Sequence, residues 1–122
     1  MGQKLSSTVL IVDDEDYIRA IASVVLKDEG FEVLQAAGTA EALELAAKHE
    51  ISVLVTDLHM PGSLNGLQLA AEIRATDPSV RVIISSGDDP SVLKGDMLGA
   101  IFLAKPYRPH QLTNAVRVQA AS

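Results

Sequence analysis

Hydrophobic and polar positions along this chain alternate between two patterns. Short apolar runs rich in β-branched residues recur five times, and such runs are typical of buried parallel strands. The predicted strands are Thr8–Val12, Phe31–Gln35, Ile51–Thr56, Val80–Ser85 and Ala100–Leu103. Between them, apolar residues recur at helical spacing, first at Ile18, Ile21, Ala22, Val25 and Leu26. The predicted helices are Asp16–Glu29, Thr39 to near His49, Gly66–Thr76, a short one at Pro90–Leu98, and one that starts after Pro109.

Local signals punctuate these segments. Gly30 is expected as the C′ glycine of the first helix, Thr39 as the cap of the second, and Asp77-Pro78 as the stop of the third. Alternating strands and helices without a repeat or linker predict a single doubly wound α/β domain with a five-stranded parallel sheet. We place this domain at residues 8–120, after a flexible N-terminus of residues 1–7, and expect no output domain in this chain.

Composition narrows the function classes. The chain has 122 residues, 48% of them hydrophobic and 21% charged, which is typical of a soluble globular domain. Its formal net charge of -6 disfavours nucleic acid or an anionic membrane as a partner. There is no cysteine, so thiol chemistry and disulfides are excluded. No signal peptide or membrane-spanning run is recognisable, and we expect a cytoplasmic protein.

Charged residues follow three of the predicted strands. Asp13-Asp14 follow the first, Asp57 the third, and Lys105 the fifth. Because the carboxyl ends of parallel strands share one edge of the sheet, we expect these side chains in one pocket. Three carboxylates there favour a cation, and an oxygen-only site suits Mg²⁺, which Mn²⁺ could replace. Singly, such acids often cap helices and such a lysine is often solvated, so the prediction rests on the combination.

This combination favours phosphoryl transfer. A carboxylate beside Mg²⁺ can attack phosphorus, and Lys105 could neutralise the charge of the phosphoryl oxygens. A hydroxyl at the end of the fourth strand, Ser85 or Ser86, could donate a hydrogen bond to one of them.

Four segments together resemble the response-regulator receiver domain of two-component signalling, a CheY-like fold. They are VLIVDDED at Val9–Asp16, VTDLHMPG at Val55–Gly62, VIISSG at Val82–Gly87 and GAIFLAKPY at Gly99–Tyr107. The resemblance covers nearly the whole chain and implies a flavodoxin-like strand order 2-1-3-4-5. The loop from Met60 to Gly66 is one residue longer than in the simplest receivers and resembles receivers attached to hybrid histidine kinases.

The resemblance also implies a role for each site residue. Asp57 would be the phosphoacceptor, Asp14 a direct Mg²⁺ ligand and Asp13 a ligand acting largely through water. The backbone carbonyl of His59 would complete the coordination, and Lys105 would pair with the acceptor.

A conformational switch is implied as well. Ser86, which is followed by glycine as in the family, would bind the phosphoryl group, and Phe102 would turn inward behind it. This movement would remodel the face formed by Pro90–Leu98, the fifth strand and the last helix. His59 and Asp88 stand where the family tunes the phosphoryl lifetime.

The resemblance implies a signalling module rather than a conventional enzyme. Its donor would be a histidine kinase or a histidine phosphotransfer protein, docking near Tyr17, Ala20 and Ser23, and its target an unidentified downstream protein. We expect a monomer or weak homodimer. It could instead be a domain excised from a hybrid histidine kinase.

Other classes fit less well. A haloacid-dehalogenase phosphatase wants an aspartate where His59 stands, and a flavodoxin-like cofactor binder would not carry the acidic run Asp13–Asp16. An interaction module that works without phosphorylation remains an alternative. The chain as given leaves no segment for a DNA-recognition helix.

Overall fold

The computed structural model describes residues 7–60, 64–87 and 99–122. In this part of the chain, strands and helices alternate until β4, and β5 comes next among the described elements. The strands are β1 (Thr8–Val12), β2 (Glu32–Ala36), β3 (Val53–Asp57), β4 (Arg81–Ser86) and β5 (Ile101–Ala104). The helices are α1 (Asp16–Asp28), α2 (Thr39–Lys48), α3 (Gly66–Thr76) and α4 (Pro109–Ala120).

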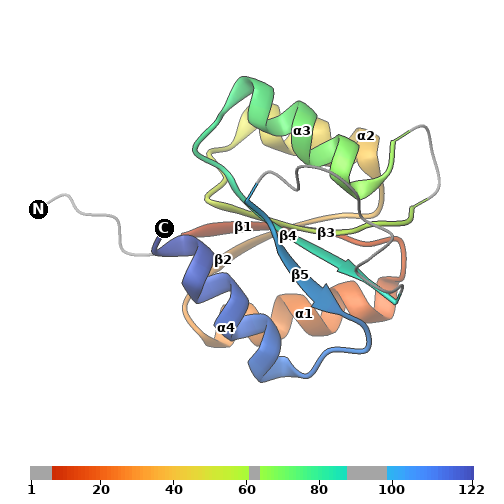
Figure 1. The fold of residues 1–122 in the computed structure, drawn as a ribbon. Coiled ribbons are helices and arrows are strands. Elements are labelled where there is room, and N and C mark those ends of the chain that lie inside the picture. Colours follow the sequence, from red (N-terminus) through yellow and green to blue (C-terminus); the bar gives the residue numbers. More distant parts are fainter. Residues whose placement is uncertain (1–6, 61–63, 88–98) are drawn as a thin grey trace, which may run out of the picture.

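All strand pairs are parallel, and the order β2-β1-β3-β4-β5 confirms the predicted doubly wound, flavodoxin-like sheet. Figure 1 shows three layers, with α2 and α3 on one face of the sheet and α1 and α4 on the other. The predicted helix at Pro90–Leu98, including Gly95, lies outside the described residues.

Alternation along the strands builds a core on each face of the sheet. Leu10 and Leu54 point to the α2–α3 side and pack against Leu69. Val9 and Val53 point to the opposite side, toward α1 and α4. Successive strand residues face opposite ways, so strands covered by helices on both faces are apolar throughout. This explains the continuous apolar runs in the sequence.

The end of α1 agrees with the prediction. Gly30 adopts a left-handed φ of 97° and donates its N–H to the Lys27 carbonyl, as a C′ glycine does. The next residue, Phe31, donates to Leu26 of the same helix. That bond makes Phe31 part of the turn, so β2 begins one residue later than expected.

The start of α2 differs from the prediction. Gly38, not Thr39, is the N-cap, and no side chain caps there. Thr39 is buried as the first helical residue, and the Glu41 carboxylate instead accepts the Ala37 N–H at 2.9 Å. This contact ties the first turn of α2 to the residue before its N-cap, and it leaves the first N–H groups of the helix without a side-chain cap.

The start of α3 carries the capping signal that the pattern analysis overlooked. Asn65 accepts the Gln68 N–H at 2.8 Å, and Gln68 accepts the Asn65 N–H at 2.9 Å. This reciprocal capping box holds the helix start next to the end of β3. None of the described helices is long and apolar enough to cross a membrane.

Candidate functional site

The register of the sheet brings the charged strand ends together. Val12 of β1 pairs with Thr56 of β3, so Asp13 lies beside Asp57. One ligand oxygen from each of Asp13, Asp14 and Asp57 lies within 4.8 Å of the others. The expected acidic pocket is therefore present at the carboxyl edge of the sheet.

Lys105 closes this pocket from the end of β5. Its Nζ lies 3.0 Å from Asp13 Oδ2, 3.2 Å from Asp57 Oδ2 and 3.7 Å from Glu15 Oε1. The backbone N–H of Lys105 donates to the Ser86 carbonyl at 2.9 Å, which ties the lysine to the neighbouring strand. A single ammonium thus neutralises part of an otherwise repulsive cluster.

Burial and charge oppose each other at the two central groups. Burial, the largest influence on Asp57, raises the pKa of its carboxyl, although Lys105 counteracts it. Burial would lower the pKa of Lys105, but Asp13 and Asp57 together outweigh it and raise that pKa. Lys105 therefore stays charged. The ionised form of Asp57 is disfavoured, because burial removes part of the hydration of its carboxylate.

The aspartates differ in exposure. Asp13 is 3% exposed and Asp57 8%, whereas Asp14 is open to solvent. An oxygen-only cluster with one solvent-facing member fits Mg²⁺, which keeps several of its waters and takes one or two carboxylates. The ligand atoms of this site are thus of the kind that suits Mg²⁺.

Three other predicted residues lie on β4 and β5, the strands that follow β3 in the sheet. Ser86 ends β4 and is 1% exposed, while the neighbouring Ser85 pairs with Asp57 in the sheet. Phe102 is half-buried on β5, opposite Ile84.

His59 follows the cluster in the chain. Its side chain is exposed, and its backbone N–H lies 3.4 Å from Asp57 Oδ1. Asp88 and loop residues 61–63 lie outside the described residues.

The predicted docking side of α1 needs two corrections. Tyr17 is 77% exposed and Ala20 is open, but Ser23 is buried and accepts a hydrogen bond from Gln35. Conversely, Ile21 was expected on the buried face and is 43% exposed. The periodic pattern did not show how far α1 is rotated over the sheet.

Ile21 instead lines a hollow of about 400 Å³ between α1 and the segment after β5. Lys105 and Glu15 stand at this hollow, and Ile18, Pro106 and Tyr107 line it as well. An apolar hollow therefore adjoins the charged pocket.

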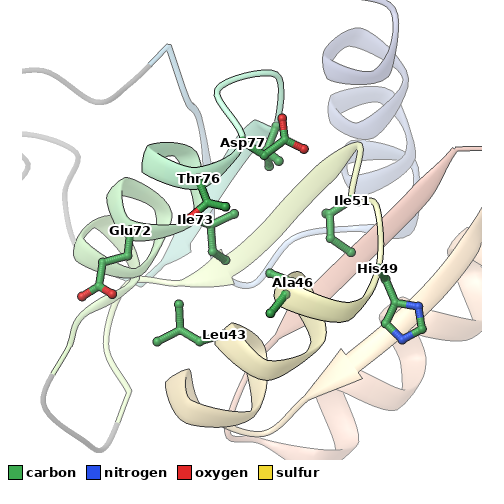
Figure 2. Close-up of a pocket in the computed structure, with 10 residues that line it drawn as sticks. Leu43, Ala46, His49, Ile51, Glu72, Ile73, Thr76 and Asp77 are labelled. Carbon is green, nitrogen blue, oxygen red and sulfur yellow. The ribbon is translucent and has the colours of Figure 1, made fainter.

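A second cavity lies between α2 and α3 and holds about 90 Å³. Figure 2 shows Leu43 and Ile73 facing it, with His49 at its rim. Its wall includes Ile51 and Val80, which precede β3 and β4, so it lies at the amino edge of the sheet. It is well below the size of ordinary ligand sites. His49 and His110 are both exposed.

The sequence analysis missed three residues that shape the acidic pocket. Glu15 reaches Lys105, and Arg19 donates to the Asp13 carbonyl at 2.7 Å. Gly66 brings the start of α3 against the backbone of Asp57. A glycine at the first position of the predicted helix Gly66–Thr76 was a signal, but the contacts of Glu15 and Arg19 have none in a single sequence.

Comparisons with known proteins agree with this geometry. The family model of the response regulator receiver domain matches residues 9–117. The transcriptional regulatory protein SrrA of Staphylococcus aureus is 30% identical over 115 residues, which are 93% of this chain and 47% of SrrA. The chain therefore spans about half the length of the curated relatives it matches.

Solved receiver domains have the same fold over most of this chain. The receiver domain of the hybrid histidine kinase CckA has a TM-score of 0.81 at 33% identity, covering 93% of this chain and 99% of that one. The response regulator TrrA of Thermotoga maritima, solved in complex with Mg²⁺-BeF, has a TM-score of 0.80 at 28% identity, covering 93% and 98%. Since the family match spans most of the chain and its fold is that of solved receivers, this chain belongs to the response regulator receiver domains of two-component signalling.

Proposed function

We propose that this domain accepts a phosphoryl group on Asp57 from a phosphohistidine donor. The observation that carries the proposal is the Asp57 carboxylate, held 3.2 Å from Lys105 in a cluster with Asp13 and Asp14. Receiver domains are signalling modules rather than conventional enzymes. In this proposal the receiver itself catalyses the transfer of the phosphoryl group to its own Asp57.

In the proposed step, an Asp57 carboxylate oxygen attacks phosphorus and the bond from phosphorus to the donor imidazole nitrogen breaks. The electron pair of that bond stays on the imidazole, which takes up a proton. Lys105 turns from the bare carboxylate to the phosphoryl oxygens and neutralises part of their charge. Mg²⁺ bound at Asp13, Asp14, Asp57 and the His59 carbonyl would supply the remaining neutralisation, and Mn²⁺ could substitute for it. Asp14 would ligate directly and Asp13 through water.

The output would be a shift between two conformations. Ser86, buried at the end of β4, would donate its hydroxyl to a phosphoryl oxygen. Phe102 is half-buried and pairs with Ile84 on the neighbouring strand β4, so it could turn inward when the carboxyl end of β4 moves. The face around β5 and α4 would then present a different surface to a downstream protein.

Two residues would set the lifetime of the phosphoryl group. His59 is exposed two residues after Asp57, close enough to affect the approach of water. Asp88 is proposed to orient hydrolytic water. If Asp88→Ala left the dephosphorylation rate unchanged, that role would be wrong.

The donor would be a histidine kinase or a histidine phosphotransfer protein. Its docking surface would be the exposed part of α1, where Tyr17 is 77%, Ile21 43% and Val24 60% exposed. The hollow next to Lys105 continues this surface to the site. We propose a cytoplasmic monomer or weak homodimer that binds neither nucleic acid nor membrane. Its likeness to the CckA receiver supports the alternative of a domain from a hybrid histidine kinase.

Intact mass spectrometry after incubation with acetyl phosphate, with and without Mg²⁺, tests this function. We expect a Mg²⁺-dependent gain of one phosphoryl group that is absent in Asp57→Asn. If wild type gains nothing from acetyl phosphate or from a phosphorylated histidine kinase, the phosphate-independent interaction module becomes the better account.

A further inference from the structure

Arg19 on α1 has a long side chain that turns back over the acidic loop after β1. Its Nη1 donates to the backbone carbonyl of Asp13 at 2.7 Å, and its Nη2 to Asp16 Oδ1 at 2.6 Å. The side chain is only 15% exposed, whereas that of its partner Asp16 is 87% exposed. The guanidinium is held in a fixed place, because one of its nitrogens binds a backbone carbonyl and the other a carboxylate.

The contact from Arg19 completes the anchoring of Asp13. The Asp13 N–H donates to the Ala36 carbonyl at 3.2 Å, and its two carboxylate oxygens accept from the Glu15 N–H at 2.9 Å and from Lys105 at 3.0 Å. The remaining polar group of Asp13 is its carbonyl, which accepts the hydrogen bond from Arg19 Nη1. Because that carbonyl belongs to the peptide that joins Asp13 to Asp14, Arg19 fixes the plane from which Asp14 starts.

Cations are distributed unequally over the acids of this loop. Asp13 and Glu15 face Lys105, and Asp16 faces Arg19. Within the described part of the chain, Asp14 has no ion pair, although its carboxylate faces Asp13 and Asp57. A carboxylate that lacks an anchor of its own depends on its backbone for its position.

We propose that Arg19 is a positioning residue that holds the Asp13–Asp14 peptide so that the Asp14 carboxylate is preorganised for the divalent cation. This inference deepens the proposed function and rests on it. Groups that orient metal ligands in this way commonly contribute 10-fold or more to metal affinity.

Whether the replacement of Arg19 weakens or tightens Mg²⁺ binding distinguishes a positioning role from simple charge repulsion. A guanidinium repels a cation bound nearby, so removing its charge alone would tighten Mg²⁺ binding. Loss of positioning does the opposite, since Asp14 must then be ordered when the cation binds. Arg19→Gln removes charge and contact together, and Arg19→Lys keeps the charge but loses the two-armed contact.

The test is a Mg²⁺ titration of the whole chain by isothermal calorimetry, with backbone amide NMR of the acidic loop as a second readout. We expect Arg19→Gln to raise the Kd by about tenfold and Arg19→Lys by about threefold. Arg117→Gln is the matched control, because Arg117 on α4 is half-exposed and pairs with Glu29, the C-cap of α1. It should bind Mg²⁺ as wild type does.

Each outcome of the Mg²⁺ titration either supports or overturns the positioning role of Arg19. A Kd for Arg19→Gln equal to or lower than that of wild type overturns the inference. If Arg19→Gln does not fold, Arg19→Lys decides: weaker binding supports positioning, and unchanged binding overturns it. A wild-type chain that binds no Mg²⁺ refutes the magnesium part of the proposed function and this inference with it. Binding by wild type that Arg19 variants leave unchanged refutes the inference alone.

Discussion

Replacing Gly66 by alanine would drive a methyl group into the backbone that carries Asp57. Gly66 is the buried first residue of α3 and donates its N–H to the Leu58 carbonyl at 2.8 Å. An added Cβ would lie 2.2 Å from the Asp57 carbonyl oxygen and 3.0 Å from the Asp57 carbonyl carbon. Both obstacles are backbone atoms, so no side chain can turn away to relieve the contact.

The size of the effect follows from that distance. Carbon and carbonyl oxygen normally approach to about 3.3 Å, so the start of α3 and the end of β3 must separate by about 1 Å. Overpacking of this kind costs about 1–3 kcal/mol, and a contact between two backbones should cost about 3 kcal/mol. For a domain of this size, that corresponds to a fall in melting temperature of about 10 °C.

The assay is urea unfolding followed by circular dichroism, with Gly38→Ala as the matched control. An alanine Cβ at position 38 would meet nothing within 4 Å, so this variant should lose only about 0.5–1 kcal/mol at its helix cap. We also expect Gly66→Ala to accept phosphate from acetyl phosphate more slowly, because a displacement of about 1 Å can cost a factor of about 100. If Gly66→Ala is as stable as Gly38→Ala, the close approach does not constrain the site as argued.

Three further results are expected. Gln119→Met should lower the free energy of unfolding in urea by about 1–3 kcal/mol, because the buried Gln119 amide donates to the Val82 carbonyl at 2.7 Å. A loss below about 0.5 kcal/mol, as for an ordinary surface substitution, would contradict this. Burial raises the pKa of Tyr107, so the folded state favours the neutral phenol. The stability that this gives is fully present below the unfolded pKa of about 10 and is lost as the pH rises through the folded pKa. An absorbance titration of the Tyr17→Phe variant, in which Tyr107 is the remaining tyrosine, should give a midpoint above 10, and a lower midpoint would refute the burial argument. Burial also raises the pKa of Asp57, so ionisation costs stability as the pH rises through the folded pKa, and Asp57→Asn should be more stable than wild type at neutral pH. The gap should shrink as the pH falls through that raised pKa and close below the unfolded pKa of about 4, and a less stable variant at neutral pH would show that Lys105 outweighs burial.

Much of the fold was predictable because its rules are local or periodic. Each described strand and helix lies within two residues of its predicted place, and Thr8–Val12 and Gly66–Thr76 were predicted to the residue. The differences arise where a contact between elements decides the boundary, as at Phe31, whose N–H is taken by α1 rather than by a strand. The buried Ser23 and exposed Ile21 show the same limit, since the rotation of α1 over the sheet is set by packing.

The acidic pocket was predictable for a different reason. In a parallel sheet, residues that follow strands meet at one edge, so Asp13, Asp57 and Lys105 could be placed together without coordinates. What the sequence could not show is how the pocket is braced. Arg19 on the Asp13 carbonyl and Gly66 against Asp57 depend on distances across the fold that no periodic pattern encodes.

Localisation of the phosphoryl group would identify the acceptor residue directly. Protein phosphorylated by acetyl phosphate in Mg²⁺ would be reduced with borohydride, which converts an aspartyl phosphate to homoserine, and then mapped by peptide mass spectrometry. We expect homoserine at position 57 and unmodified aspartate at positions 13 and 14. Modification at Asp13 or Asp14, or an unmodified Asp57 in a protein that carries phosphate, would contradict the assignment of Asp57 as acceptor.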